Sequence, residues 1–177
     1  MTVTIKRLHA LEPEHIAQLA SVLLDCVEGG ASVNFVWPFT AAEARAFWRR
    51  LAPEVQAGTR VLLVAEDAGR VVGTVNLALC WQPNQPHRAD VTKLLVARSA
   101  RRQGVGSGLM AALERAALEA GRCLLTLDTE SGGTAERLYE QLGWVRLGVI
   151  PEYALGTDGA LCSATFFYKK LLREQRA

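Results

Sequence analysis

A short segment near the middle of the chain combines arginines, a glutamine and glycines directly before a run of helix-forming residues. Positions 101–107 read Arg-Arg-Gln-Gly-Val-Gly-Ser, and a further glycine, Gly108, follows. Glycine inside a helix costs about 1 kcal/mol relative to alanine, so this concentration indicates a tight turn or the close approach of another group. The first N–H groups of a helix lack internal partners, and the helix dipole adds positive charge there. A glycine-rich turn entering a helix therefore predicts a phosphate-binding loop.

Two common phosphate-binding motifs do not fit this segment. A Walker loop needs a lysine directly after its second glycine, and no lysine follows the glycines here. The dinucleotide fingerprint Gly-x-Gly-x-x-Gly, counted from Gly104, needs glycine as its sixth residue, whereas the chain has Leu109. The glycines alone also permit a loop that binds nothing, so the arginines and the surrounding elements must decide.

Two aspartates occupy positions suited to acid–base chemistry. Asp90 lies on an apolar strand that leads toward the glycine segment, and Asp128 follows the apolar run Cys123–Leu127. Ligand sites in open α/β sheets lie at the carboxyl ends of parallel strands, which is where Asp128 is expected. Each carboxylate could act as a general base or bind a cationic group of a substrate. Each could instead form a surface salt bridge or cap a turn.

Local signals place these residues in a chain of helices and strands. The capping box Thr40-Ala-Ala-Glu43 predicts a helix from Ala41 to about Gln56, whose aromatic pair Phe47-Trp48 supplies bulk for the core. The segments Arg60–Glu66 and Val71–Trp81 read as strands separated by a short turn, which predicts an antiparallel hairpin.

A strand–helix–strand unit surrounds the glycine segment. Its parts are a strand at Ala89–Val96, a helix from Val105 closed by Gly121, and a strand at Cys123–Leu127. Such a crossover predicts two parallel, adjacent strands. The whole chain, residues 1–177, is expected to form one α/β (α+β) domain with a mixed twisted sheet of about seven strands flanked by about four helices. The remaining elements are strands at Val3–Arg7, Trp144–Val149 and Ala164–Tyr168 and helices at Pro13–Val27 and Thr134–Leu142.

The composition narrows the class of protein. Half of the residues are apolar, 21% are charged and the net charge is +2, which gives no reason to expect a nucleic-acid or membrane partner. Four scattered cysteines without a Cys-x-x-Cys pair indicate reduced thiols, and three dispersed histidines give no metal-ligand spacing. No 18-residue apolar stretch or leader is evident, so a cytoplasmic location is the expectation.

The arginine and glycine spacing is similar to that of a known family. Residues 101–106 match [RQ]-x-x-G-x-[GA], which resembles the acetyl-CoA pyrophosphate loop of the GNAT superfamily of N-acetyltransferases, and the predicted order of elements also resembles that fold. The resemblance implies acetyl-CoA as the cofactor. It implies that the loop binds the pyrophosphate and that the preceding strand end offers backbone groups to the pantetheine arm. The residues concerned are Arg101, Arg102, Gln103, Gly104, Val105, Gly106 and Ser107 in the loop, and Leu94, Leu95 and Val96 in the strand.

A narrower resemblance covers most of the chain, from about Gly29 to Lys169. The phrases GGASVNFV, LALCWQPN, RADVTKLLV through RRQGVG, and LLTLDTESG look like the tabtoxin-resistance type of acetyltransferase. This type implies an acidic residue at the positions of both Asp90 and Asp128. Sequences that share these phrases need not share a substrate.

Tyr139 is the residue that the resemblance assigns as general acid. Ala135, Tyr139 and Gly143 match the family pattern A-x-x-x-Y-x-x-x-G, in which the tyrosine lies near the sulfur of CoA. A tyrosine with a pKa near 10 begins protonated at neutral pH, as an acid must. It could alternatively only pack the short helix on the sheet. Where many relatives carry asparagine seven residues before the tyrosine, this chain has Gly132, so a polar contact to the cofactor would come from Ser131 or Thr134.

The superfamily also suggests which aspartate removes a proton. Asp90 lies eleven residues before Arg101, an offset at which several members hold a glutamate that acts through water. Aspartate is one methylene shorter, which favours a water relay. Two-residue alternation predicts that Asp90, Thr92, Leu94 and Val96 share one face of the strand. Asp128 is the second candidate base, and the choice between the two stays open.

The acceptor is expected to contact the apolar segment at positions 31–39. Asn34 is a candidate substrate contact there, while Phe35 and Trp37 either line the site or pack in the core. The loop at positions 81–88 could form part of the rim. The resemblance implies acetyl transfer to a primary amine of a small molecule, such as an amino-acid-like toxin or metabolite, by direct attack without a covalent enzyme intermediate. The alternatives are an aminoglycoside or protein amino-terminal acceptor, and a non-catalytic acyl-CoA sensor; either a monomer or a homodimer is compatible with the sequence.

Overall fold

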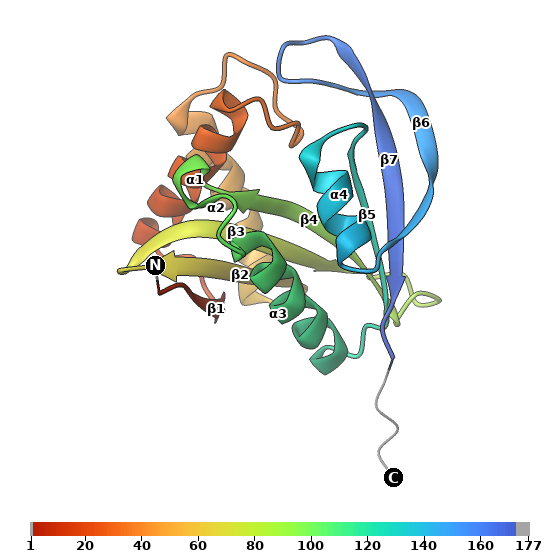
Figure 1. The fold of residues 1–177 in the computed structure, drawn as a ribbon. Coiled ribbons are helices and arrows are strands. Elements are labelled where there is room, and N and C mark those ends of the chain that lie inside the picture. Colours follow the sequence, from red (N-terminus) through yellow and green to blue (C-terminus); the bar gives the residue numbers. More distant parts are fainter. Residues whose placement is uncertain (1, 173–177) are drawn as a thin grey trace.

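The computed structural model describes residues 2–172, whose strands form a seven-stranded sheet in the order β1-β2-β3-β4-β5-β7-β6 (Figure 1). A 3-10 turn, Arg98–Ala100, follows β4, and no helix within residues 2–172 is both long and apolar enough to cross a bilayer. The strands are β1 (Thr4–Leu8), β2 (Arg60–Asp67), β3 (Arg70–Leu79), β4 (Arg88–Val96), β5 (Leu124–Glu130), β6 (Val145–Leu155) and β7 (Leu161–Lys170), and the α-helices of these residues are α1 (Pro13–Glu28), α2 (Ala41–Gln56), α3 (Val105–Glu119) and α4 (Thr134–Gln141).

Locally encoded elements form where the sequence predicts them. At the start of α2, the Thr40 hydroxyl accepts a bond from the Glu43 N–H (3.2 Å), and the Glu43 carboxylate accepts one from the Thr40 N–H (2.8 Å). Strands β2 and β3 pair as an antiparallel hairpin, and β4 and β5 are parallel neighbours. The predicted mixed sheet with four flanking helices is therefore confirmed for the described residues.

The end of the chain contains longer strands than the sequence pattern predicts. Strand β6 continues to Leu155 instead of ending at Val149, passing through Pro151. An edge strand tolerates proline because its missing N–H would not face a partner strand. Strand β5 continues to Glu130, with Asp128 opposite Phe166 of β7. Asp128 therefore lies within a strand, not in a turn after it.

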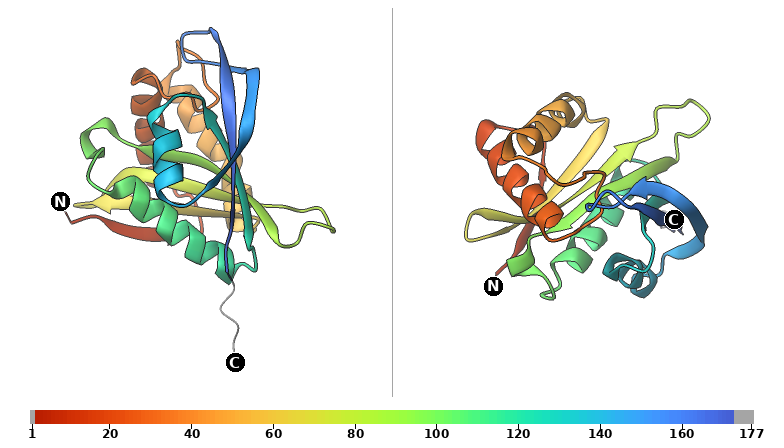
Figure 2. Two further views of the ribbon diagram at one scale, coloured as in Figure 1. Left: turned by 45° about the vertical axis from the view of Figure 1, so that its right-hand side comes forward. Right: turned by 90° about the horizontal axis from the view of Figure 1, so that it is seen from above.

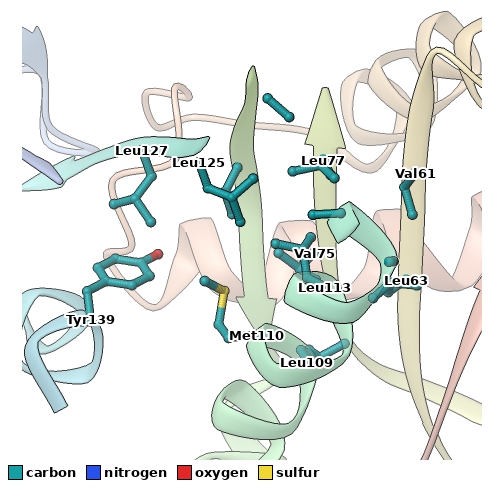
Figure 3. Packing of buried hydrophobic residues seen from close by; sticks show 14 of the residues in the cluster. Val61, Leu63, Val75, Leu77, Leu109, Met110, Leu113, Leu125, Leu127 and Tyr139 are labelled. Carbon is teal, nitrogen blue, oxygen red and sulfur yellow. The ribbon is translucent and has the colours of Figure 1, made fainter. Parts of the chain in front are cut away.

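Helices cover both faces of the sheet (Figures 1 and 2). Helices α1 and α2 pack on one face with Leu62, Val64 and the fully buried Trp48. Helices α3 and α4 pack on the other face, against a core that includes Val61 and Leu63 and is drawn in Figure 3. The alternation along β2 thus supplies both cores, as expected for a central strand with two buried faces.

Strands β4 and β5 pair over only part of their length. The parallel register joins Arg88–Asp90 to Leu124–Thr126. Beyond these residues β4 stays paired with β3 as far as Val96, while β5 stays paired with β7 as far as Glu130. We call the diverging segments, residues 91–96 and 127–130, the β4–β5 split. Each has an edge that bonds to no neighbouring strand within the described sheet.

A bulge in β4 changes which residues share a face. Thr74 and Asn76 of β3 lie opposite Leu95 and Thr92, so β4 contains one extra residue, and Lys93 has a φ of 55°. The predicted common face of Asp90, Thr92, Leu94 and Val96 is therefore wrong. Asp90 and Thr92 lie on the α1/α2 face with Leu95, whereas Leu94 and Val96 pack toward the α3 face.

Candidate functional site

The start of α3 forms an amide-rich loop. Gly104 is the N-cap residue with φ 77°, a left-handed conformation that glycine adopts without steric cost. The first helical bond runs from the Gly108 N–H to the Gly104 carbonyl (2.9 Å), so the preceding N–H groups of the helix have no internal partner. A surface hollow of about 440 Å³ lies at this turn and is lined by Gln103, Gly104, Val105 and Gly108 and, on the β1 side, by Val3 and Ile5. The unpartnered N–H groups of the turn suit a phosphate group.

The glycines of this segment serve different purposes. A Cβ at Gly106 would lie 3.4 Å from Leu138 Cδ2 of α4, and a Cβ at Gly108 would lie 3.1 Å from Ile5 Cδ1 of β1. Gly108 thus permits close packing of α3 on β1. Gly108 is thus a glycine that another group approaches closely, and this group is a side chain of the protein itself.

The arginines of the loop also differ in role. The Arg101 Nε donates to the Val96 carbonyl (3.2 Å), and its Nη2 lies 4.0 Å from the Cys26 sulfur. Gln103 Nε2 donates to the Ser99 carbonyl (3.1 Å). These contacts hold the loop in shape, and Arg101 and Arg102 are both exposed next to its backbone amides.

Tyr139 lies in the core beside the β4–β5 split. It is 6% exposed, and its ring centroid lies 5.9 Å from that of Trp144 and 5.8 Å from that of Phe167. Figure 3 shows the ring below Leu127 with its hydroxyl directed away from α4. Burial, and secondarily the Asp128 carboxylate, raises the pKa of Tyr139 above its usual value. The hydroxyl therefore keeps its proton at neutral pH.

The two candidate bases have different surroundings. Asp90 accepts a bond from Arg88 Nη1 (2.6 Å) and one from the Thr126 hydroxyl, so its carboxylate is held in place. Asp128 has no ion-pair partner among the described residues. Burial raises the pKa of Asp128, the Asp90 charge adds to this effect, and Lys93 opposes it. Of the two carboxylates, Asp128 is thus the one without an ion pair and with a raised pKa.

Lys93 is the site residue that the sequence reasoning missed. Its Nζ donates to Asn34 Oδ1 and lies 5.6 Å from the ring centroids of both Phe35 and Phe47. Burial lowers the pKa of Lys93 to about 8, with Asp128 opposing and Arg60 adding to the shift. The signal was present in ADVTKLLV, where the doublets Thr-Lys and Leu-Leu break strict alternation and indicate a bulge.

Replacing Lys93 with methionine should stabilise the fold. Lowering a lysine pKa from 10.5 to about 8 corresponds to roughly 3 kcal/mol against the protonated folded state, offset in the variant by the lost Asn34 contact. We expect Lys93→Met to raise the free energy of unfolding by about 1–2 kcal/mol at pH 7. The gain is full below the folded pKa and fades as pH rises toward the unfolded value. Urea titrations at pH 7 and at about pH 10 measure both points, and an equal difference at the two pH values would contradict the assignment.

The predicted acceptor segment lies in the loop between α1 and α2. Asn34 reaches Lys93, and Phe35 packs on Phe39 and Phe47 with ring centroids 4.4 and 5.3 Å apart. Trp37 is 51% exposed, and its backbone N–H donates to the Thr157 carbonyl (2.8 Å) in the β6–β7 turn. This loop thus connects the α1/α2 layer to the last hairpin. Asn34 and Phe35 therefore lie beside Lys93, whereas Trp37 lies at the exposed edge of this loop.

Two other predicted contacts lie at the margins. Thr134 begins α4 and is exposed. The Ser131 hydroxyl is bonded to Thr165 (2.8 Å), and the Glu136 carboxylate accepts bonds from both Thr165 and the Gly132 N–H. Thr134 is therefore freer than Ser131 to meet a ligand. The loop at positions 81–88 projects from the molecule (Figure 2), and it contacts the site at its end, where Arg88 donates to Asp90 and, through Nε, to Gln85 Oε1 (2.8 Å).

Comparison with known proteins identifies one family by sequence and finds solved acetyltransferase structures with a similar fold. Residues 27–144 match the sequence pattern of the Acetyltransferase (GNAT) family. Similar solved structures include yncA, a putative acetyltransferase from Salmonella typhimurium with its cofactor acetyl-CoA (20% identity, 99% of this chain and 96% of that chain, TM-score 0.77). A ribosomal-protein-alanine N-acetyltransferase from Brucella melitensis (24%, 95% and 99%, 0.77) and an aminoglycoside 6'-N-acetyltransferase complexed with coenzyme A (18%, 97% and 98%, 0.73) share the same fold.

Proposed function

Because the chain belongs to the acetyltransferase (GNAT) family and is an acetyl-CoA-dependent N-acetyltransferase, we propose that it acetylates the primary amine of a small molecule by direct attack. The observation that carries the proposal is the grouping at the β4–β5 split of a protonated Tyr139, of Asp128, a carboxylate without an ion-pair partner, and of the half-buried Lys93. A split that exposes strand backbone on one side and charged side chains on the other can hold two reactants together.

The residues around α3 fit the cofactor. The N–H groups that open α3 and the exposed Arg102 would hold the pyrophosphate, and the free edge of Leu94–Val96 would accompany the pantetheine arm. Thr134 is a further candidate contact. When bound, acetyl-CoA supplies the acetyl group as an activated thioester.

Three side chains would move or orient protons. The Asp128 carboxylate accepts the proton of the attacking amine, directly or through one water, and its raised pKa makes it a stronger base than an ordinary aspartate. Asp90, fixed by Arg88 and Thr126, adds negative charge beside Asp128 and positions the water or the amine. The Tyr139 hydroxyl donates its proton to the departing sulfur.

The alternatives meet specific difficulties at this site. An aminoglycoside is polycationic and calls for an acidic site, whereas Lys93 and Arg60 place positive charge next to Asn34. A protein amino terminus needs an open groove, whereas the α1–α2 loop is joined to the β6–β7 turn by the Trp37–Thr157 bond. A non-catalytic sensor would not need Tyr139 and Asp128 within electrostatic reach of each other. The resemblance to the tabtoxin-resistance type favours a small acceptor as well.

Substitution of each aspartate should separate base from positioning residue. We expect Asp128→Asn to lower kcat by about 100-fold and to remove the rise in rate that wild type shows as pH passes the raised pKa of Asp128. Asp90→Asn should lower kcat by about tenfold while keeping that rise, because Asp128 is still present. Initial rates of thiol release between pH 5 and 10 measure both profiles. A rise that survives in Asp128→Asn and vanishes in Asp90→Asn would reverse the two roles.

The proposed function itself is tested by an acceptor screen. Purified protein and acetyl-CoA are incubated with small primary amines, aminoglycosides and peptides that have free amino termini, and thiol release is recorded. We expect turnover with small amines only. Tight acetyl-CoA binding without turnover on any class would favour the sensor, and a preference for peptides or aminoglycosides would replace the small-molecule assignment.

A further inference from the structure

Lys93 carries a positive charge that no anion of the described chain neutralises. An ammonium group has three N–H donors, and here the hydrogen bond to Asn34 Oδ1 uses one. No carboxylate oxygen within residues 2–172 forms an ion pair with Nζ. Nζ also lies over the rings of Phe35 and Phe47, 5.6 Å from each centroid. Lys93 is half-buried, and its Nζ keeps donors that no group of the described residues uses, so an anion from outside the chain can bind there.

The opposite charge at the split is equally unpaired. Asp128 lies on β5, across the β4–β5 split from Lys93, and the two groups influence each other's pKa without forming an ion pair. Neither group has another partner of opposite charge among the described residues. A ligand that carries both a cationic or amine group and an anionic group would satisfy both.

Neighbouring side chains increase this separation of charge. Arg60, which is bound to Glu54 (2.8 Å) and donates to Thr92 Oγ1 (3.4 Å), acts electrostatically on Lys93. Asp90 acts in the same way on Asp128. The site is thus positive at the Lys93 end and negative at the Asp128 end.

The cofactor is not the source of the missing anion. Its phosphates are placed at the start of α3, beyond Val96, which is three residues and about 10 Å along the strand from Lys93. The bulge also directs Lys93 to the α1/α2 side, where Asn34 and Phe47 lie. The thioester end of the cofactor carries no charge. The anion must therefore belong to the acceptor.

We propose that Lys93 is a specificity-determining residue that binds an anionic group of the acceptor, so that the acceptor is an amine bearing its own anionic group, such as a carboxylate. This inference rests on the proposed function and adds the second group by which the substrate is recognised. The amine lies toward Asp128 and Tyr139, and the anion lies toward Lys93. A small zwitterion spans the two charges, whereas a neutral or polycationic amine leaves Lys93 unpaired.

Matched acceptor pairs test this inference. Each α-amino acid is compared with its α-amino amide, which keeps the amine and removes the negative charge. Wild type should show kcat/KM at least tenfold higher for the acids, although the amine of the amide has the lower pKa and is the more reactive at neutral pH. In Lys93→Met, kcat/KM for the acids should fall about 10- to 100-fold, the value of a lost charge-assisted hydrogen bond, with a much smaller loss for the amides. Lys93→Arg should retain part of the preference.

The controls separate this inference from the function on which it rests. Lys6→Met, at a lysine of β1 paired with Glu66 (2.7 Å), should behave as wild type. Calorimetry should give Lys93→Met the wild-type affinity for acetyl-CoA, and a weakened affinity would assign Lys93 to the cofactor and overturn the inference. Equal losses on acids and amides, or a wild-type preference for amides, would also overturn it while leaving acetyl transfer intact. No thiol release with any amine, despite acetyl-CoA binding, would overturn the proposed function instead.

Discussion

Gly104→Val should abolish measurable binding of acetyl-CoA, with an affinity at least 100-fold below that of wild type in calorimetry. The N-cap position has φ 77°, which costs a residue with a Cβ about 1–2 kcal/mol, and a β-branched residue more. A Cβ at Gly104 meets no atom within 4 Å, so the effect does not come from a clash in the unliganded fold. The effect has two sources. The strained backbone of the loop at positions 101–107 turns its amides away from the pyrophosphate, and the new valine side chain stands where the phosphates would lie. Loss of one or two amide–phosphate bonds, at about 1.5–3 kcal/mol each, accounts for the expected change.

The chain offers a matched control for backbone strain. Gly69, in the β2–β3 turn, has the same φ of 77°, and a Cβ added there would likewise meet no atom within 4 Å. Gly69→Val should therefore lose a similar amount of stability and bind acetyl-CoA as wild type does. If both variants lose binding equally, strain and not the loop explains the result. If Gly104→Val retains wild-type affinity, the pyrophosphate does not lie on these amides.

Elements with local signals could be predicted from the sequence, because their determinants are neighbours in the chain. The capping box at Thr40 and Glu43 fixes the start of α2, and the left-handed Gly104 fixes the start of α3. The Arg88–Asp90 pair was also within reach, since residues two apart on a strand project to the same side. The glycine loop at positions 101–107 and the motif of Ala135, Tyr139 and Gly143 could be recognised for the same reason, because the residues of each are close in sequence.

The remainder of the site depends on contacts between distant parts of the chain. Lys93 and Asn34 are 59 positions apart, and only the bulge in β4 brings them together. The same bulge reverses the face of Leu94 and Val96, which simple alternation cannot anticipate. The different surroundings of Asp90 and Asp128 follow from where β4 and β5 separate. Asp90 lies in the paired part and accepts a bond from Thr126 of β5, whereas Asp128 lies beyond the last paired residues. Sequence could name both carboxylates but could not rank them.

Tyr139→Phe should lower kcat by about 100- to 1,000-fold while leaving the affinity for acetyl-CoA within threefold of wild type. The ring keeps its packing against Trp144 and Phe167, and among the described residues no hydrogen-bond partner of the hydroxyl is lost. Only the proton for the departing sulfur disappears, so turnover falls and binding does not. Tyr153→Phe, at a tyrosine of β6 that is 48% exposed, is the matched control and should retain wild-type kcat.

The pH profile gives an independent test of the same role. Burial and the Asp128 carboxylate raise the pKa of Tyr139, so the acid stays protonated as pH rises through the usual tyrosine range near 10. In wild type, kcat should therefore hold its plateau up to about pH 10, because the acid has not yet lost its proton. In Tyr139→Phe the plateau should be lower but equally flat, since no titrating acid remains. A wild-type decline in kcat below about pH 9 that persists in Tyr139→Phe would assign the proton donor to another group.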